Sequence, residues 1–199
     1  NMANETEKFG LPQVLIDFKT KGVTAIKRSA RGVVVLILKC ETTDVSNKYR
    51  ISDVSEIPSK VFDEATTDLI KKCLDGTPLR VLVYTLPKED VVGAQHTQAT
   101  LLKQLKHIRY NYIAAPTGTE QDQQDLASYV KAERNNARKT VKAVVANVAA
   151  DHKGIINFCA DEIKVVKGKE SSGKPTYKTY TTIEYTARIA GILAGLALD

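Results

Sequence analysis

One unbroken apolar run, VVVLIL between Gly32 and Lys39, constrains the fold of this chain most strongly. A strand with one solvent-exposed face alternates apolar and polar residues, and this run contains no polar residue. It therefore predicts a strand buried on both faces, as in a parallel sheet that helices cover on both sides. The run is also much too short to cross a bilayer, so no membrane partner is expected.

Helical and extended patterns alternate after this run. They occur in the following order: a helix after Pro58 that stops at Gly76, a strand over Leu79–Leu86, a helix over Gln95–Ile108, a strand over Tyr110–Ala115, a helix that begins near Gly118 or Thr119 and ends near Lys139, and a strand over Val141–Val148. This alternation predicts an α/β fold, with a mostly parallel sheet flanked by helices.

The regular alternation ends after Asp151. Ile155–Cys159 and Ile163–Val166 have the composition of short strands, and the polar stretch Lys167–Pro175 indicates a hairpin or crossover turn. Ile183–Leu198 is predicted to be an apolar helix with Ala and Gly at close-packing positions. Because such a helix needs cover and the sequence stops directly after it, we expect the 199 residues to be part of a longer chain.

The charge of the chain does not indicate a polyanionic partner. Lys and Arg number 29 and Asp and Glu 23, which gives a net charge of +6, but the basic residues form no stripe and only 6% of residues are aromatic. Phosphate-backbone binding usually combines a basic stripe with stacking aromatic rings, so nucleic-acid binding is not predicted. The polar, acidic start of the chain has no apolar signal segment, which predicts a cytoplasmic protein.

Metal and thiol chemistry are not indicated either. Cys40, Cys73 and Cys159 are odd in number and widely spaced, which predicts reduced, buried thiols and no disulfide framework. His96 and His107 fall on one predicted helix, too far apart to share a metal ion. We therefore expect no metal, no cofactor and no catalytic residue.

Two short segments have some phosphate-binding character. Gly168–Pro175 matches the GxxxxGK pattern of a P-loop, but Pro175 stands where Ser or Thr must hold magnesium, and β-like residues follow it. Pro116–Thr119 (PTGT) lies where the carboxyl ends of parallel strands form a crevice. These residues leave open an alternative function, that of a nucleotide-binding α/β enzyme.

Two long segments resemble a known family. Phe9–Lys39 (FGLPQVLIDFKTKGVTAIKRSARGVVVLILK) resembles the opening of the tail sheath proteins of contractile phage tails and phage-tail-like bacteriocins, with a β-forming entry, a basic segment and a hydrophobic strand. Tyr185–Gly195 (YTARIAGILAG) is similar to the Ala- and Gly-rich segment that leads into the C-terminal domain of that family. The resemblance implies an N-terminal fragment of a sheath protein, without its C-terminal domain.

The resemblance implies a structural role and no enzymatic activity. Sheath subunits polymerise around a tail tube, meet baseplate proteins and drive contraction when their lattice rearranges. By the same resemblance, the protein is expected to assemble in the bacterial cytoplasm and to become part of a phage tail or a tail-like particle. Because the C-terminal domain is missing, the chain of 199 residues is expected to be a monomer.

The resemblance also divides the chain into an extended N-terminal arm, residues 1–20, and an α/β sheath domain, residues 21–199, that is truncated at its C-terminal end. Strand addition by the arm would link neighbouring subunits, and the residues expected to make this link are Leu15, Ile16, Asp17 and Phe18. The candidate lattice contacts are Lys27, Arg28 and Arg31. The segment Leu11–Phe18 can instead be an ordinary edge strand of the same domain.

Overall fold

The structure is a computed structural model that describes residues 31–89 and 92–196. Residues 1–30, 90–91 and 197–199 lie outside the described part. The expected arm, with its linking residues 15–18, falls outside it, as do Lys27 and Arg28. Of the candidate contact residues, Arg31 is described.

A six-stranded sheet forms the centre of the described fold, with the strand order β2-β3-β1-β4-β5-β6. Its strands are β1 (Val33–Glu41), β2 (Lys48–Ile51), β3 (Arg80–Pro87), β4 (Tyr112–Ala114), β5 (Lys142–Ala146) and β6 (Ile155–Phe158). β2 runs antiparallel to β3, and the other neighbours pair in parallel. The expected mostly parallel α/β sheet is therefore confirmed.

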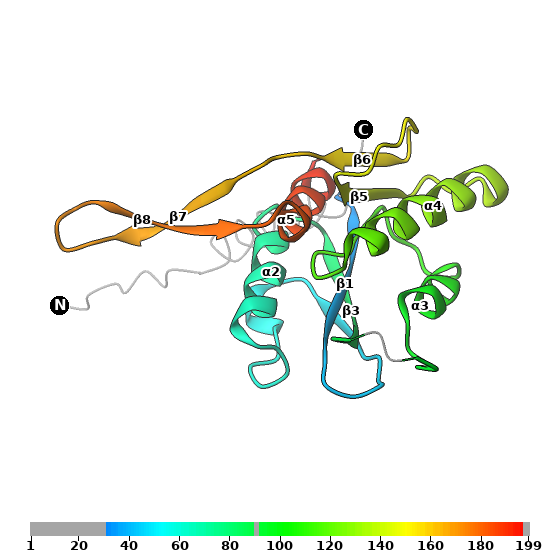
Figure 1. Cartoon of the computed structure of the whole chain (residues 1–199), viewed down its shortest axis with the longest axis horizontal. Helices are drawn as coiled ribbons and strands as arrows, with labels where there is room; N and C mark the ends of the chain where they lie inside the picture. Colours follow the sequence, from blue (N-terminus) through cyan, green and yellow to red (C-terminus); the bar gives the residue numbers. More distant parts are fainter. Residues whose placement is uncertain (1–30, 90–91, 197–199) are drawn as a thin grey trace, which may run out of the picture.

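Two helices cover each face of this sheet (Figure 1). α2 (Glu64–Leu74) and α5 (Thr182–Gly195) pack on one face, and α3 (Gln98–Leu105) and α4 (Glu120–Ala137) pack on the other. The central part of β1 from Val34 to Leu38 is at most 1% exposed, because its alternate side chains enter the two opposite cores. This burial on both sides is what the unbroken apolar run predicted.

Glycines let α2 and α5 approach each other backbone to backbone. A Cβ added at Gly191 would overlap the carbonyl oxygen of Cys73 and lie 2.8 Å from its carbonyl carbon. A Cβ at Gly76 would overlap the backbone of Gly191 in the same way. The close-packing role expected of the Ala- and Gly-rich segment is thus confirmed. At the end of α5, the carbonyl oxygen of Ala194 accepts a hydrogen bond of 2.7 Å from the backbone N–H of Gly32, directly before β1.

A separate two-stranded hairpin extends from this body (Figure 1). It consists of β7 (Ile163–Lys169) and β8 (Pro175–Tyr180), which pair antiparallel. The predicted hairpin is confirmed, although β7 continues three residues beyond the expected end at Val166. The P-loop-like residues lie in these two strands and the turn between them, and a strand, not a helix N-terminus, follows them directly.

Three expectations about single residues were wrong. His96 and His107 lie outside α3 on opposite sides, because Thr97 caps the helix at its start and the helix ends at Leu105. Cys159 is exposed, because it follows the short edge strand β6, whereas Cys73 is buried and Cys40 half-buried. Apolar periodicity does not locate the first and last turn of a helix, and the number and spacing of the cysteines do not show which of them lies at the edge of a sheet.

Candidate functional site

The crevice where parallel sheets usually bind ligands is filled by the chain itself. In such sheets the crevice forms where successive connections go to opposite sides of one strand. Here β3 lies on one side of β1 and β4 on its other side, so the crevice lies outside the carboxyl ends of β1 and β4. There Lys39 Nζ lies 2.8 Å from Asp122 Oδ2, and the two side chains are only 7% and 11% exposed. The backbone N–H of Lys39 also donates to Thr117 Oγ1 over 2.6 Å.

Asp122 occupies the N-terminus of α4, where an anion would bind. Its Oδ2 accepts a hydrogen bond of 2.7 Å from the N–H of Thr119, and the Thr119 hydroxyl accepts one of 3.1 Å from the N–H of Asp122. A Cβ at Gly118 would lie 2.9 Å from the Cβ of Asp122, so the loop fits closely around this carboxylate. The groups that Pro116–Thr119 can offer to a phosphate therefore hold an internal carboxylate.

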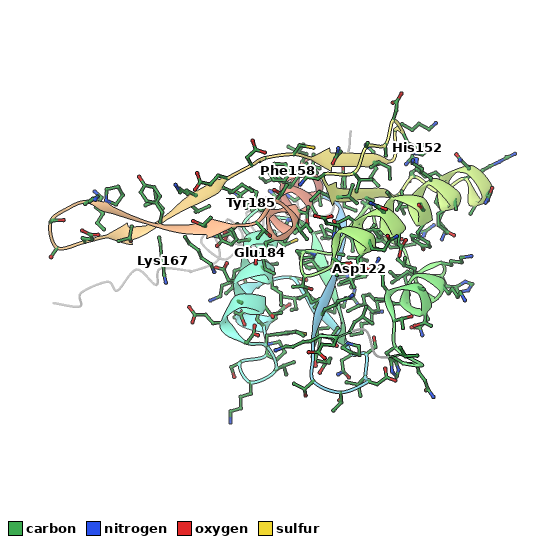
Figure 2. The ribbon with its side chains drawn as sticks, in the orientation of Figure 1. Asp122, His152, Phe158, Lys167, Glu184 and Tyr185 are labelled. Carbon is green, nitrogen blue, oxygen red and sulfur yellow. The ribbon has the colours of Figure 1, made fainter. Side chains whose placement is uncertain are left out.

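Sequence reasoning missed this ion pair, although a signal for it was present. Thr119 and Asp122 have the spacing of a capping box, which pairs a hydroxyl with an acidic side chain three residues later. The partner Lys39 is at the end of β1, far away in sequence, and no local pattern indicates that it faces α4. Figure 2 shows Asp122 within the body of the fold, on the side of α4.

The hairpin presents apolar side chains that the described residues leave uncovered. Val166 and Tyr177 are direct cross-strand partners, and they are 59% and 54% exposed. Most of the surrounding charged residues are lysines, namely Lys164, Lys167, Lys169 and Lys174. An isolated two-stranded hairpin is marginally stable in water, so its form depends on how its base is held.

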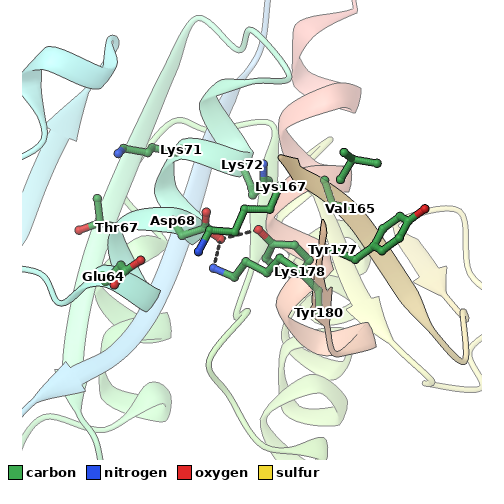
Figure 3. A pocket seen from close by; sticks show the side chains of 11 residues that line it. Glu64, Thr67, Asp68, Lys71, Lys72, Val165, Lys167, Tyr177, Lys178 and Tyr180 are labelled. Atoms are coloured by element: carbon green, nitrogen blue, oxygen red, sulfur yellow. Dashed lines mark hydrogen bonds and ion pairs between the residues drawn. The ribbon is translucent and has the colours of Figure 1, made fainter. Parts of the chain in front are cut away.

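Polar contacts from α2 hold the base of the hairpin (Figure 3). Asp68 accepts a hydrogen bond of 2.8 Å from Lys178 Nζ and one of 2.6 Å from the Tyr180 hydroxyl. Burial raises the pKa of Asp68, but these hydrogen bonds and the charges of Lys178 and Lys72 outweigh it, so the net pKa is lowered. A groove of about 500 Å³ runs between α2 and the hairpin beside these residues.

Aromatic rings join the hairpin to α5 and β6. Tyr185 of α5 lies between two rings, with centroid distances of 5.8 Å to Phe158 and 5.8 Å to Tyr180. Figure 2 shows Phe158 and Tyr185 at the point where the hairpin leaves the body. These contacts orient the base of the hairpin, whereas its tip extends into solvent with residues 166–174 all exposed.

The remaining candidate residues do not form a chemical site. Arg31 donates from its guanidinium to the carbonyl oxygen of Thr77 over 3.2 Å, so it contacts its own domain at the start of β1. Across residues 31–89 and 92–196, no three His, Cys, Asp or Glu side chains gather closely enough to hold a metal ion. Among the described helices, none has the length and apolar character needed to cross a bilayer.

Comparison with known proteins gives a clear sequence relative. The chain is 27% identical to the tail sheath protein of Clostridium phage phiCD119 over an aligned length of 193, and the match covers 93% of this chain. The chain spans about half of that relative, 48% of its length. No family model matches the chain.

Solved structures agree with this result at the level of the fold. The sheath tail protein of Desulfitobacterium hafniense matches with a TM-score of 0.56 and 14% identity, over 83% of this chain and 59% of that one. The sheath tail protein of Listeria innocua matches with a TM-score of 0.56 and 15% identity, over 87% and 60%. The similarity to tail sheath proteins that the sequence indicated is therefore confirmed, in sequence and in fold.

Proposed function

We propose that this chain is a structural subunit of a contractile tail sheath, which polymerises around a tail tube and drives contraction by rearrangement of its lattice. The sequence similarity to a phage tail sheath protein over 93% of the chain carries this proposal. The fold shared with two sheath tail proteins supports it independently. The filled crevice at Lys39 and Asp122 adds a physical reason, since the usual ligand site of such a sheet is closed by an internal ion pair.

The place of action follows from this role. Sheath subunits of one kind assemble with each other, so the first partner is a second copy of the same protein, with the tail tube and baseplate proteins as further partners. The protein would be made and assembled in the bacterial cytoplasm and remain in the finished tail. A structural subunit needs a stable body and surfaces that contact its neighbours. The sheet covered by helices on both faces would supply the stable body, and the projecting hairpin would supply a contact surface.

Linkage between subunits is proposed for the segment before the described body. In this proposal, residues 1–20 form an arm that separates from the α/β domain, residues 21–199, and adds a strand to a neighbouring subunit. Leu15, Ile16, Asp17 and Phe18 would make that contact, while Lys27, Arg28 and Arg31 would contact the lattice. Heterologous contacts of this kind do not close on themselves, and they therefore build helical assemblies.

Electron microscopy tests this function. The chain, and a longer chain with the full length of the phage relative, are each mixed with purified tail tubes and imaged in negative stain. We expect the longer chain to decorate tubes or form rings, and Leu15→Asp with Phe18→Asp to abolish this. The matched control, Asn4→Asp with Thr6→Asp, changes charge equally in the same segment and should assemble normally. Globular particles from the longer chain, with and without tubes, would refute the proposed function.

A further inference from the structure

The two ends of the central sheet carry grooves of opposite charge. At the amino ends of β4 and β5, a groove of about 560 Å³ is lined by Lys106, His107, Arg109, Arg138 and Lys139, with no acidic residue among its lining residues. At the carboxyl ends of β1 and β3, a groove of about 310 Å³ is lined by Glu41, Asp44 and Glu89, with Lys88 as its basic residue. We call these the basic groove and the acidic groove.

The position of the grooves follows from the topology. The loops after α3 and α4 lead into β4 and β5, so they gather at the amino edge of the parallel strands. The acidic groove lies at the other edge, where Glu41 ends β1 beside Pro87 of β3. β1 is nine residues long, which separates the two edges by roughly 26 Å at about 3.3 Å per residue. The two grooves therefore lie on opposite ends of one rigid body.

The basic groove keeps a positive charge after its internal partners are considered. Glu133, whose side chain is 8% exposed, lies 2.6 Å from Lys139 Nζ and 3.9 Å from Lys106 Nζ, so it offsets part of the charge. The carboxyl ends of α3 and α4 together offset about one further charge. Arg109 and Arg138 are exposed and extend the surplus to the surface. After Glu133 and the two helix ends are subtracted from the four Lys and Arg side chains, the groove keeps a surplus of about two positive charges.

The acidic groove keeps its charge at neutral pH. Asp44 accepts hydrogen bonds from the backbone N–H groups of Gln95, 2.8 Å away, and His96, 3.0 Å away. These bonds lower the pKa of Asp44, so the carboxylate is ionised and held in place. Glu41 is fixed in the same way, because its Oε1 accepts from the Thr85 hydroxyl over 2.6 Å. The carboxylates of Asp44 and Glu41 are therefore held in place before any partner arrives.

We propose that the basic groove of one copy binds the acidic groove of a second copy, head to tail. This inference rests on the proposed function, and it adds a contact through the body of the domain to the contact proposed for the arm. Opposite charges on opposite ends of one molecule favour this arrangement over a symmetric dimer formed through either groove alone, in which like charges would meet. A head-to-tail contact leaves one groove free at each end, so it continues into a row of copies. Alone it is weak and sensitive to salt, and a lattice adds many such contacts together.

Zero-length cross-linking of the 199-residue chain tests the contact. Equal amounts of ¹⁵N-labelled and unlabelled chain are mixed and treated with a carbodiimide, which joins a carboxylate to an amine in direct contact. We expect peptides of mixed isotope that join Lys106 or Lys139 to Glu41, Asp44 or Glu89. Their yield should fall at least tenfold from about 0.02 M to about 0.3 M salt, because the Debye length shrinks below the width of the contact.

Charge reversal makes the test specific. Arg109→Glu with Arg138→Glu reverses the basic groove and keeps the reactive lysines, whereas Thr43→Arg with Glu89→Arg reverses the acidic groove and keeps Glu41 and Asp44. Each variant alone should lose the mixed-isotope cross-links, and a mixture of the two variants should restore them. The control Lys103→Glu with Lys131→Glu changes the charge of α3 and α4 by the same amount as the first variant and should cross-link like the wild type.

The outcomes separate this contact from the proposed function. No groove-to-groove cross-link at low salt, or no restoration in the mixture, would overturn the head-to-tail contact. If the longer chain still assembles on tubes in that case, the sheath function stands without it. If the cross-links form as expected but the longer chain never assembles, the contact stands and the sheath function fails.

Discussion

Replacement of Gly191 by Ala tests whether the approach of α2 and α5 determines the stability of the body. In an open helix, Ala is more favourable than Gly by about 1 kcal/mol. Here the new Cβ would overlap the carbonyl oxygen of Cys73 and lie 2.9 Å from its Cα. Both are backbone atoms, so no side-chain rotation can relieve the contact, and the helices must separate.

The magnitude follows from what that separation disturbs. Ala187, Ala190 and Ala194 of α5 and Cys73 of α2 are fully buried at this interface. Overpacking of such a core costs about 3 kcal/mol at the upper end of the usual range. After the gain in helix propensity, we expect a net loss of about 2 kcal/mol in the free energy of unfolding. For a domain of this size, that loss lowers Tm by about 4–8 °C.

Denaturant unfolding, followed by circular dichroism, measures the effect against a matched control. Gly168→Ala makes the same chemical change in the hairpin, where the nearest heavy atom to the new Cβ is Thr176 Oγ1 at 3.5 Å. We expect this control to leave stability unchanged or slightly raised. If Gly191→Ala were as stable as the wild type or more so, helix propensity would dominate at this position and the packing argument would be wrong.

Three further experiments test other contacts. Asp122→Asn removes the ionic partner Asp122 of the buried Lys39 and should lower the free energy of unfolding by about 3 kcal/mol, while the double variant with Lys39→Met should recover part of this loss in the same denaturant assay. A single variant at wild-type stability would contradict the role of the pair. Because the pair fills the crevice, a saturating nucleotide should leave the Tm of the wild-type chain unchanged. Because the folded-state pKa of Asp68 is lowered, its contribution is present above the unfolded pKa of about 3.9 and is lost as pH falls through the folded pKa. Amides at the hairpin base should then exchange faster in acid, and Asp68→Asn should remove this pH dependence; equal acid sensitivity in the variant would argue against the anchor. Thiol titration at neutral pH should label the exposed Cys159 first and the buried Cys73 only on unfolding. Cys40 should react slowly, because burial and then the charge of Glu41 raise its pKa to about 11. Equal labelling rates for all three cysteines would contradict these differences in burial.

The sequence predicted the sheet better than the contacts between distant residues. An apolar run such as Val33–Leu38 indicates its own burial, because both of its faces must be covered. The anchor of the hairpin could not be found in this way, since Asp68 and Lys178 are 110 residues apart and each is typical of a solvated surface. The charged grooves were missed for the same reason: their residues come from loops that only the topology brings to one edge.

The hydrogen bond from Gly32 to Ala194 has a mechanical consequence. It places the entry into β1 beside the exit from α5, so both connections of the described body leave from one corner. Tension applied through these two connections would act across this corner and would not stretch the six strands along their length. A displacement applied through both connections would therefore move the body as a unit without deforming its sheet.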